Sequence, residues 1–283
     1  MTDFRLLTSG DEPLLEAFLV SHRDTSMFLR ANVRRAGLVY RGAPFQAVHA
    51  AALRDGRVVG VVAHCWNGMM LVQAPEDAPE LARACAGWSQ RKVTGLAGLP
   101  AQVRAARSAL GLGDAATAVD GDEWLYALDV PKLLVPAALT TGAIVCRAPR
   151  AEERDTLCAW RLAYDIEVMG ASDSPEARER SAAFLDAQIA DGNAWVAVDG
   201  ERLVSLSAFN ASLPDIVQLG GIYTPPALRG RGYARAAVAA SVLSAGARGA
   251  SRAVLFTPNP HAVRAYEALG FHRVGDYALI LFG

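Results

Sequence analysis

The stretch from Val217 to Ala237 reads VQLGGIYTPPALRGRGYARAA and carries several signals for local structure in succession. The run 217–223 is mostly apolar, which is typical of a buried β-strand, and the prolines at 225 and 226 end that strand. A basic, glycine-containing turn follows at 229–232, and the alanine-rich run that begins at Tyr233 predicts a helix. The sequence therefore predicts a strand, a turn and a helix N-terminus one directly after another.

This turn has the properties of a phosphate-binding loop. The first N–H groups of a helix lack internal partners, and the helix dipole places roughly half a positive charge beside them. Gly230 and Gly232 let the backbone approach a ligand closely, and the guanidinium groups of Arg229, Arg231 and Arg235 add positive charge. The arrangement suits a pyrophosphate, and the alternative is a glycine-rich loop with solvated arginines.

The same residues resemble a family signature. Arg229, Gly232 and Ala234 match the pattern Arg or Gln, two residues, Gly, one residue, then Gly or Ala, which marks the GNAT superfamily of acetyl-CoA-dependent N-acetyltransferases. The resemblance implies acetyl-CoA as co-substrate, no metal, and hydrogen bonds from the backbone of Ile222 and Thr224 to the pantetheine arm. The residues expected to bind the cofactor are Ile222, Tyr223, Thr224, Arg229, Gly230, Arg231, Gly232, Tyr233, Ala234, Arg235 and Asn259.

A strand that both pairs in a sheet and lines a cofactor must separate from its neighbour. Gly220 and Gly221 permit a β-bulge directly before the expected pantetheine contacts. The alternative is that these glycines only make the strand flexible.

A second stretch, at 256–271, resembles the other GNAT signature. The resemblance implies that Asn259 contacts the cofactor and that Tyr266 protonates the departing thiolate. A phenol with a pKa of about 10 can act as such a general acid, and the alternative for Tyr266 is a packed aromatic on an amphipathic helix. His261, at the start of the same helix, is interpreted as a surface residue without a catalytic role.

The general base is less clearly marked. Direct transfer needs a group that accepts the proton of the attacking amine. The family often has a Glu on the strand that leads into the phosphate loop, where this chain has Gln218, which cannot act as a base. We predict Glu167 as the substitute and Asp165 as the second choice, because the loop after the first helix overhangs the acceptor cleft in this family. The alternative is that both carboxylates are solvated at a helix end.

Length and composition limit the classes of partner. With 283 residues and 52% apolar residues, the chain can bury two cores. The formal net charge of −1 gives no reason to expect nucleic acid or an anionic membrane. The four cysteines lack metal-ligand spacing, and the start of the chain lacks the pattern of a signal peptide, so the cytoplasm is the expected compartment.

The order of helices and strands recurs in the two halves, which predicts an α/β (α+β) chain of two GNAT-like units. In each unit we expect a mixed, largely antiparallel sheet flanked by helices. The proline-containing segment 131–141 is consistent with a connection, so the predicted domains are 1–140 and 141–283. The first domain is expected to be degenerate and the second to be the catalytic N-acetyltransferase, so that the chain is a pseudo-dimer.

In the first half, the stretch 73–80 stands where the phosphate loop would be, and it has three acidic residues and no glycine. Such a segment would repel a pyrophosphate.

The predicted function is that of an acyltransferase whose second half moves an acetyl group from acetyl-CoA to a primary amine by direct attack. The amine belongs to a small molecule or a peptide, and longer acyl groups stay open. The alternatives are a non-catalytic acyl-CoA sensor and a protein-interaction module.

Overall fold

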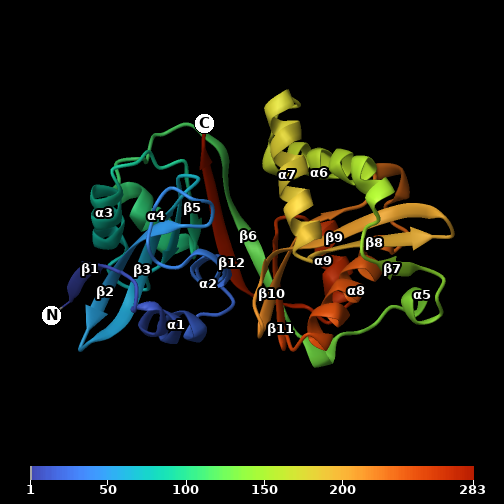
Figure 1. The fold of residues 1–283 in the computed structure, drawn as a ribbon, viewed down its shortest axis with the longest axis horizontal. Coiled ribbons are helices and arrows are strands. Elements are labelled where there is room, and N and C mark those ends of the chain that lie inside the picture. The colour runs from blue at the N-terminus through green and yellow to red at the C-terminus, as the bar shows by residue number, and fades with distance from the viewer. Residues whose placement is uncertain (1) are drawn as a thin grey trace. The chain divides into compact units, whose positions relative to one another are not determined.

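The computed structural model describes residues 2–283, which form two compact units (Figure 1). Unit 1 takes in the chain up to Trp124 together with Gly275–Gly283, and unit 2 is Leu125–Val274. The division falls inside strand β6 (Thr117–Asp129), ahead of the expected boundary near residue 140. The difference has a physical reason, because the proline-containing segment packs within unit 2, where the N–H of Leu134 donates to the carbonyl oxygen of Leu269 at 3.0 Å.

The sheet of unit 1 has the strand order β1-β2-β3-β4-β5-β12. Its neighbours pair antiparallel except β4 and β5, which are parallel. The last strand comes from the C-terminal end of the chain and pairs with β5 from Ala278–Gly98 to Leu281–Gly95. The strands of this unit are β1 (Asp3–Leu6), β2 (Ala47–Arg54), β3 (Arg57–Cys65), β4 (Met69–Gln73), β5 (Gly95–Gly98) and β12 (His272–Phe282), and the helices are α1 (Glu12–Ser21), α2 (Met27–Ala36), α3 (Ala78–Ser89) and α4 (Pro100–Ala109).

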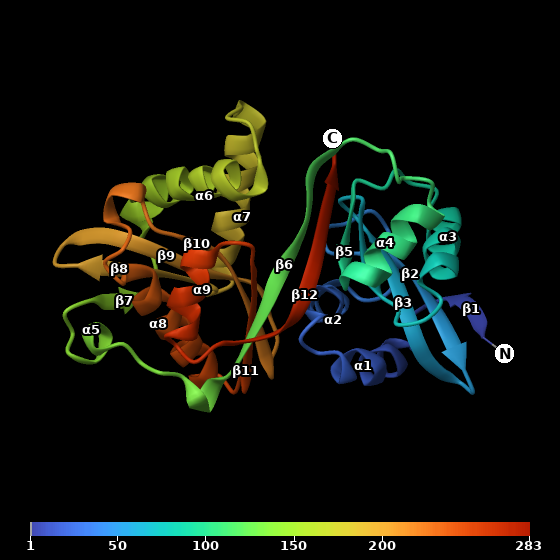
Figure 2. The same cartoon turned by 180° about the vertical axis from the view of Figure 1, so that it is seen from behind.

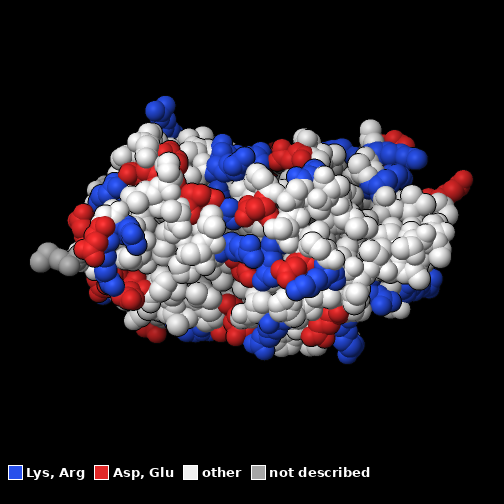
Figure 3. All heavy atoms as spheres, turned by 90° about the horizontal axis from the view of Figure 1, so that it is seen from below, with Lys and Arg blue, Asp and Glu red and all other residues white. Residues whose placement is uncertain are grey.

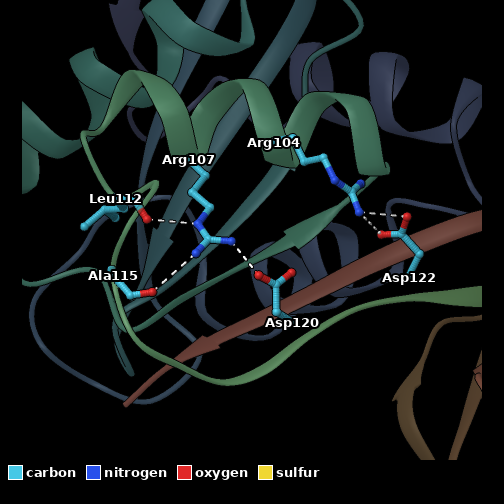
Figure 4. A network of polar contacts seen from close by, with 6 residues as sticks. All are labelled: Arg104, Arg107, Leu112, Ala115, Asp120 and Asp122. Carbon is cyan, nitrogen blue, oxygen red and sulfur yellow. Dashed lines mark hydrogen bonds and ion pairs between the residues drawn. The ribbon is translucent and has the colours of Figure 1, made fainter.

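Two arginines of α4 hold the segment that leads from this helix into β6 (Figure 4). Arg107 donates to the carbonyl oxygens of Leu112 at 2.9 Å and Ala115 at 3.3 Å and forms an ion pair with Asp120. Arg104 donates to both carboxylate oxygens of Asp122 at 2.9 Å. The bonds to Leu112 and Ala115 hold the connection that precedes β6. The contacts with Asp120 and Asp122 hold the first part of β6 itself.

The sheet of unit 2 has the order β6-β11-β10-β9-β8-β7. Its pairs are antiparallel from β7 to β10 and parallel between β10 and β11, so the predicted mixed, largely antiparallel fold class is confirmed in both units. The elements of unit 2 after β6 are η1 (Val130–Lys132), α5 (Ala137–Thr140), β7 (Val145–Arg147), η2 (Ala151–Glu153), α6 (Arg154–Met169), α7 (Pro175–Ala190), β8 (Ala194–Asp199), β9 (Arg202–Ser212), β10 (Ile216–Tyr223), η3 (Pro226–Leu228), α8 (Tyr233–Ala247), β11 (Arg252–Thr257) and α9 (Pro260–Glu267).

Helices cover both faces of the unit 2 sheet, and the alternation of side chains along β8 shows which helix lies on which face (Figures 1 and 2). Val196 packs with Leu157 of α6 and Leu185 of α7. The next residue, Ala197, packs with Ala236 of α8. Because successive residues of a strand point to opposite faces, α6 and α7 lie on one face and α8 lies on the other.

Strand β10 has the predicted bulge. Its register against β9 shifts between Gly220, which pairs with Ala208, and Tyr223, which pairs with Leu206. Gly221 lies inside the shift with φ of +65°, a left-handed conformation that a residue with a Cβ adopts only with strain. The prediction of a bulge at the paired glycines is therefore confirmed.

The bulge coincides with a loss of pairing on the other edge of β10. The parallel ladder with β11 runs from Ile216–Arg252 to Gln218–Val254, and among the described residues it extends no further. Both strands continue beyond that point, β10 to Tyr223 and β11 to Thr257. The two strands therefore open from each other between Leu219 and the phosphate-loop turn.

Charged side chains of both signs are interspersed over the face seen in Figure 3, as expected for a formal net charge of −1. Among residues 2–283, none of the helices combines the length and the hydropathy that a bilayer span requires.

The buried contact between α6 and the sheet should carry much of the stability of unit 2. Leu157 is fully buried, and truncation to Ala should lower the free energy of unfolding by about 2–5 kcal/mol through lost transfer energy and an unfilled cavity. Urea denaturation of the Leu157→Ala variant measures this. Leu243 of α8, which is 44% exposed, is the matched control, and Leu243→Ala should cost about 0.5 kcal/mol or less. Equal losses in the two variants would contradict this account of the core.

Candidate functional site

The turn between β10 and α8 has the conformation that its sequence predicts. Pro226–Leu228 form a short 3₁₀ turn, and Gly230 and Gly232 follow with φ of +78° and +83°. Gly232 is the N-cap of α8 and its carbonyl oxygen accepts the first helical hydrogen bond, from the N–H of Ala236 at 3.2 Å. Two left-handed residues so close together require glycine, and they turn the chain sharply from the strand into the helix.

This turn leaves a cluster of backbone donors without partners. From Gly230 to Arg235, no N–H group donates to another residue among those described in the structure. The positive end of the dipole of α8 lies at the same place. Unpartnered N–H groups and a helix N-terminus together form a site for an anion such as a diphosphate, so the backbone of the predicted loop fits the predicted ligand.

The side chain of Arg229 is held in place. Its Nε donates to the carbonyl oxygen of Thr224 at 2.9 Å, and its Nη1 and Nη2 donate to the carboxylate of Glu167 at 2.9 and 2.7 Å. All three nitrogens of this guanidinium are thus engaged. A diphosphate at the loop would have to share Arg229 with Glu167 or displace Glu167 from it.

The same ion pair bears on the role of Glu167. The hydrogen bonds from Arg229 lower the pKa of the Glu167 carboxyl below its ordinary value. A carboxylate with a lowered pKa and two engaged oxygens is a weaker proton acceptor. To act as a base, Glu167 would have to leave Arg229. Both side chains are roughly half exposed, so the pair itself adds little to stability.

The other side chains of the loop divide into two groups. Tyr233 is buried, its ring packs with Leu228 and Ala236, and its hydroxyl donates to Asp199 at 2.6 Å. The same hydroxyl also interacts with the side chain of Arg231 on the loop. Arg231 and Arg235 are exposed on the loop itself, and the guanidinium of Arg235 lies over Gly232, where a Cβ would approach its Nη2 to 3.1 Å.

The end of β10 offers backbone groups at the opening between the strands. Ile222 and Thr224 are half-buried there, on either side of Tyr223. The hydroxyl of Ser205 donates to the carbonyl oxygen of Tyr223 at 3.1 Å and lies 2.9 Å from the Thr224 hydroxyl. These contacts fix one edge of the strand to β9 while its other edge is released from β11. An extended arm such as pantetheine could pair with this released edge of β10, as a neighbouring strand would.

Tyr266 lies on α9 beside this opening of the sheet. It is 8% exposed, its ring packs edge-on against Phe271 with centroids 6.0 Å apart, and burial raises the pKa of its phenol. Its hydroxyl makes no hydrogen bond to another residue among 2–283. An electrostatic interaction with Tyr164 of α6 raises the pKa of Tyr266 further.

Asn259 begins α9. Its side-chain oxygen accepts from the N–H of His261 at 2.9 Å, and its own N–H donates to the hydroxyl of Thr257 at 3.1 Å. This N-cap leaves the side-chain NH₂ group exposed and directed to a ligand or to water. His261 is also exposed and lies beside Arg264, in agreement with the prediction that it is a surface residue.

The residue at the family's usual base position is buried. Gln218 is 2% exposed, its side-chain nitrogen donates to the carbonyl oxygen of Leu219 at 2.8 Å, and its Oε1 has no partner among the described residues. The second candidate base, Asp165, is also engaged. It accepts two hydrogen bonds from Arg161, at 3.2 and 2.8 Å, and one from Ser181 at 2.6 Å.

Sequence reasoning missed Arg161 and Tyr164. Both lie on α6, with the guanidinium of Arg161 5.1 Å from the ring centroid of Tyr164. Arg161 lies against the bulge at Gly221, and Tyr164 interacts electrostatically with Tyr266. The one available signal was the spacing of Arg161 and Asp165, which are four residues apart and on the same side of a helix. Nothing in that spacing distinguishes a buried pair from a surface pair.

Unit 1 lacks the corresponding opening. Its parallel strands β4 and β5 pair from Met69–Gly95 to Val72–Gly98, and Gly98 lies so close to the carbonyl oxygen of Val72 that a Cβ would overlap it. The N–H of Ala74, just beyond β4, donates to the side chain of Gln102 at 2.8 Å. The place where a pantetheine arm would enter is therefore filled by the protein itself.

The helix that follows this closed edge also differs. Asp77 is the N-cap of α3, and Arg54 forms ion pairs with both Glu76 and Asp77. Carboxylates thus occupy the positive end of that helix, where a phosphate would be repelled. Within the described part of the chain, no three His, Cys, Asp or Glu side chains group as metal ligands.

Residues 160–271 match the model of the acetyltransferase (GNAT) family. The match begins within α6 and extends just past α9, so it includes the phosphate loop, the bulge and Tyr266. No curated protein matches the chain.

Solved structures share the fold over nearly the whole chain. A Drosophila protein is 15% identical with a TM-score of 0.68, and 98% of each chain is covered. A GCN5-related N-acetyltransferase from Sphaerobacter thermophilus is 15% identical with a TM-score of 0.59, covering 99% of this chain and 94% of that one. A tandem GNAT protein from the clavulanic acid biosynthesis pathway is 13% identical with a TM-score of 0.55, covering 100% and 98%. These likenesses show a shared fold over almost the full length of the chain, in agreement with the predicted tandem arrangement.

The ion pair between Glu167 and Arg229 can be tested by binding. Replacing Glu167 by Gln removes the negative charge that neutralises Arg229 and should tighten the binding of coenzyme A about two- to fivefold. Isothermal titration of the variant with coenzyme A at low and high salt measures this. Glu179→Gln, an exposed change on α7, is the control and should leave affinity unchanged. Weaker binding in Glu167→Gln would show that Glu167 instead presents Arg229 to the ligand.

Proposed function

We propose that unit 2 transfers the acetyl group of acetyl-CoA directly to a primary amine, since residues 160–271 match the model of the acetyltransferase (GNAT) family. The observation that carries the proposal is the opening of β10 from β11, next to a loop of unpartnered N–H groups. The first feature suits an extended arm and the second suits its diphosphate. The acceptor is an amine of a small molecule or a peptide.

The proposed cofactor contacts follow the geometry of the loop. The backbone from Gly230 to Arg235 binds the diphosphate, with Arg231 and Arg235 adding charge at its rim. The backbone of Ile222, Tyr223 and Thr224 binds the pantetheine arm in place of a neighbouring strand. Asn259 adds the exposed NH₂ group of its side chain at the start of α9.

Direct attack is favoured over an acyl-enzyme on the state of the cysteines. Burial raises the pKa of Cys65 and Cys85 to about 12 and that of Cys146 to about 11, and it raises the pKa of Cys158 as well. The thiolate is the nucleophilic form of cysteine, and these groups stay protonated at neutral pH. The nitrogen of the acceptor therefore attacks the thioester carbon itself.

In the proposed reaction, the C–N bond forms, the C–S bond breaks, and Tyr266 gives its phenolic proton to the departing sulfur. Burial raises the pKa of Tyr266, which keeps the phenol protonated and ready to donate at neutral pH. The same burial destabilises the departing thiolate and so raises the pKa of the coenzyme A thiol as well. Proton transfer from Tyr266 to the sulfur therefore stays favourable although the pKa of the phenol is raised. The attacking nitrogen loses its proton to Glu167 once that carboxylate leaves Arg229, or to water.

Unit 1 is proposed to be a degenerate GNAT-like domain that binds no acetyl-CoA. The closed β4–β5 edge and the carboxylates at the start of α3 support this assignment. Its role would then be to scaffold the acceptor side or to support unit 2.

A second candidate function is an acyl-CoA sensor that binds without turnover. It is favoured by the buried Gln218 at the usual base position and by the engagement of Glu167 with Arg229. The two candidates differ in one measurement. A sensor binds acetyl-CoA and releases no coenzyme A with any amine, whereas an acetyltransferase releases it with a subset of amines.

Replacing Tyr266 by Phe should lower kcat roughly a hundredfold or more, since the departing sulfur loses its proton donor, while the KM for acetyl-CoA changes little. Release of coenzyme A over a panel of amines is the readout. Tyr126→Phe is a matched control, because Tyr126 is also a buried tyrosine of unit 2 and donates to Glu267 at 3.1 Å, outside the loop and the bulge. Unchanged kcat in Tyr266→Phe would exclude Tyr266 as the acid.

A further inference from the structure

The guanidinium of Arg161 is fixed on the acceptor side of the opened strands. Its Nε and Nη2 donate to Asp165 at 3.2 and 2.8 Å, and Asp165 in turn accepts from the Ser181 hydroxyl at 2.6 Å. The rings of Tyr164 and Phe184 lie 5.1 and 4.4 Å from its central carbon. The Arg161 side chain is 12% exposed, so salt bridge and rings together leave it one conformation.

The third nitrogen of this guanidinium has no partner. Nη1 of Arg161 is buried and donates to no residue among those described. A buried charged donor without an acceptor costs free energy, and proteins rarely keep one unless a ligand or water completes it. Burial and chemistry both indicate that something outside the chain supplies the missing oxygen.

The direction of Nη1 places that oxygen at the proposed reaction centre. A Cβ built on Gly221 would lie 2.9 Å from Nη1, so the donor points at the bulge where β10 opens from β11. Gln218, on the same strand before the bulge, carries a second unpartnered atom, the acceptor Oε1.

We propose that Arg161 determines the choice of acceptor by donating through Nη1 to a carboxylate that lies beside the reacting amine. The acceptor is then an α-amino acid or a close analogue. A lysine side chain has no oxygen near its ε-nitrogen and would leave Nη1 unsatisfied. A carboxylate is favoured over an uncharged carbonyl because the bond is charge-assisted on both sides. The inference rests on the proposed function and names the substrate class of the same site.

The test compares acceptors that differ only in the group beside the amine. A panel of α-amino acids is assayed with acetyl-CoA next to the corresponding carboxamides and decarboxylated amines. The amino acid should show the highest kcat/KM in at least one such set, by roughly tenfold or more. Equal rates within every set would overturn the proposal while leaving acetyl transfer itself intact.

The variant that tests Arg161 must not leave a buried carboxylate unpaired. Arg161→Gln combined with Asp165→Asn removes both charges of the pair together. It should raise the KM for the amino acid roughly 10- to 100-fold and abolish the preference over the amide, with the KM for acetyl-CoA unchanged. The matched control, Arg154→Gln with Asp186→Asn, removes an exposed bidentate pair between α6 and α7 and should alter neither constant. A double variant that keeps the preference would overturn the assignment.

A second readout does not depend on turnover. In the presence of coenzyme A, calorimetry with an N-acetyl amino acid and with the matching N-acetyl amine should show tighter binding of the acid, and the Arg161 double variant should lose this difference. If the difference is found but no amine is acetylated, the proposed function fails and the recognition of a carboxylate stands. If amines are acetylated and the acid binds no better than the amine, only the inference about Arg161 fails.

Discussion

The separation of β10 from β11 is the constraint on which the site depends. Three paired positions hold the strands together at one end, and the ladder stops at Gln218 and Val254. Beyond it the left-handed Gly221 turns β10 out of register, and the strand edge becomes available to a ligand rather than to a neighbour. In most sheets an unpaired edge favours aggregation, because its exposed N–H and C=O groups can pair with a strand of another chain. Here it is bordered by α6, α9 and the loop before α8.

In unit 1, the parallel strands β4 and β5 do not separate from each other. Its parallel pair is complete to Val72 and Gly98, and the side chain of Gln102 satisfies the next backbone donor. The comparison within one chain indicates that the fold alone does not create the site. A bulge glycine, a turn without carboxylates and a gap in one ladder create it.

Much of the fold of unit 2 could be predicted from local pattern. The strand, turn and helix around Arg229 follow from apolar runs, prolines and glycines, which act over a few residues. The same reasoning placed the unit boundary near residue 140, because two prolines resemble a linker locally, whereas their packing against unit 2 depends on distant residues such as Leu269. The short strand at Asp3–Leu6 escaped prediction for the same reason, since only its pairing with β2 makes it a strand.

The site was predictable where a backbone motif forms it and not where side chains meet across the fold. The loop and the bulge follow from residues close in sequence. Whether Glu167 reaches Arg229, and whether Arg161 points at Gly221, depends on how α6 lies on the sheet. That angle cannot be predicted from a single sequence. The charged residues of α6 could therefore be identified from the sequence, but their partners on other elements could not.

The C-terminal strand of the sheet in unit 1 has a consequence for biosynthesis. Residues Ala278–Leu281 pair with β5, and all of unit 2 is translated between those partners. The ribosome therefore releases unit 2 before unit 1 can close its hydrogen-bond ladder, and the open edge of β5 is exposed to other chains during that interval. A nascent chain of this design should depend more on chaperones for its first half than for its second, although the first half is made earlier.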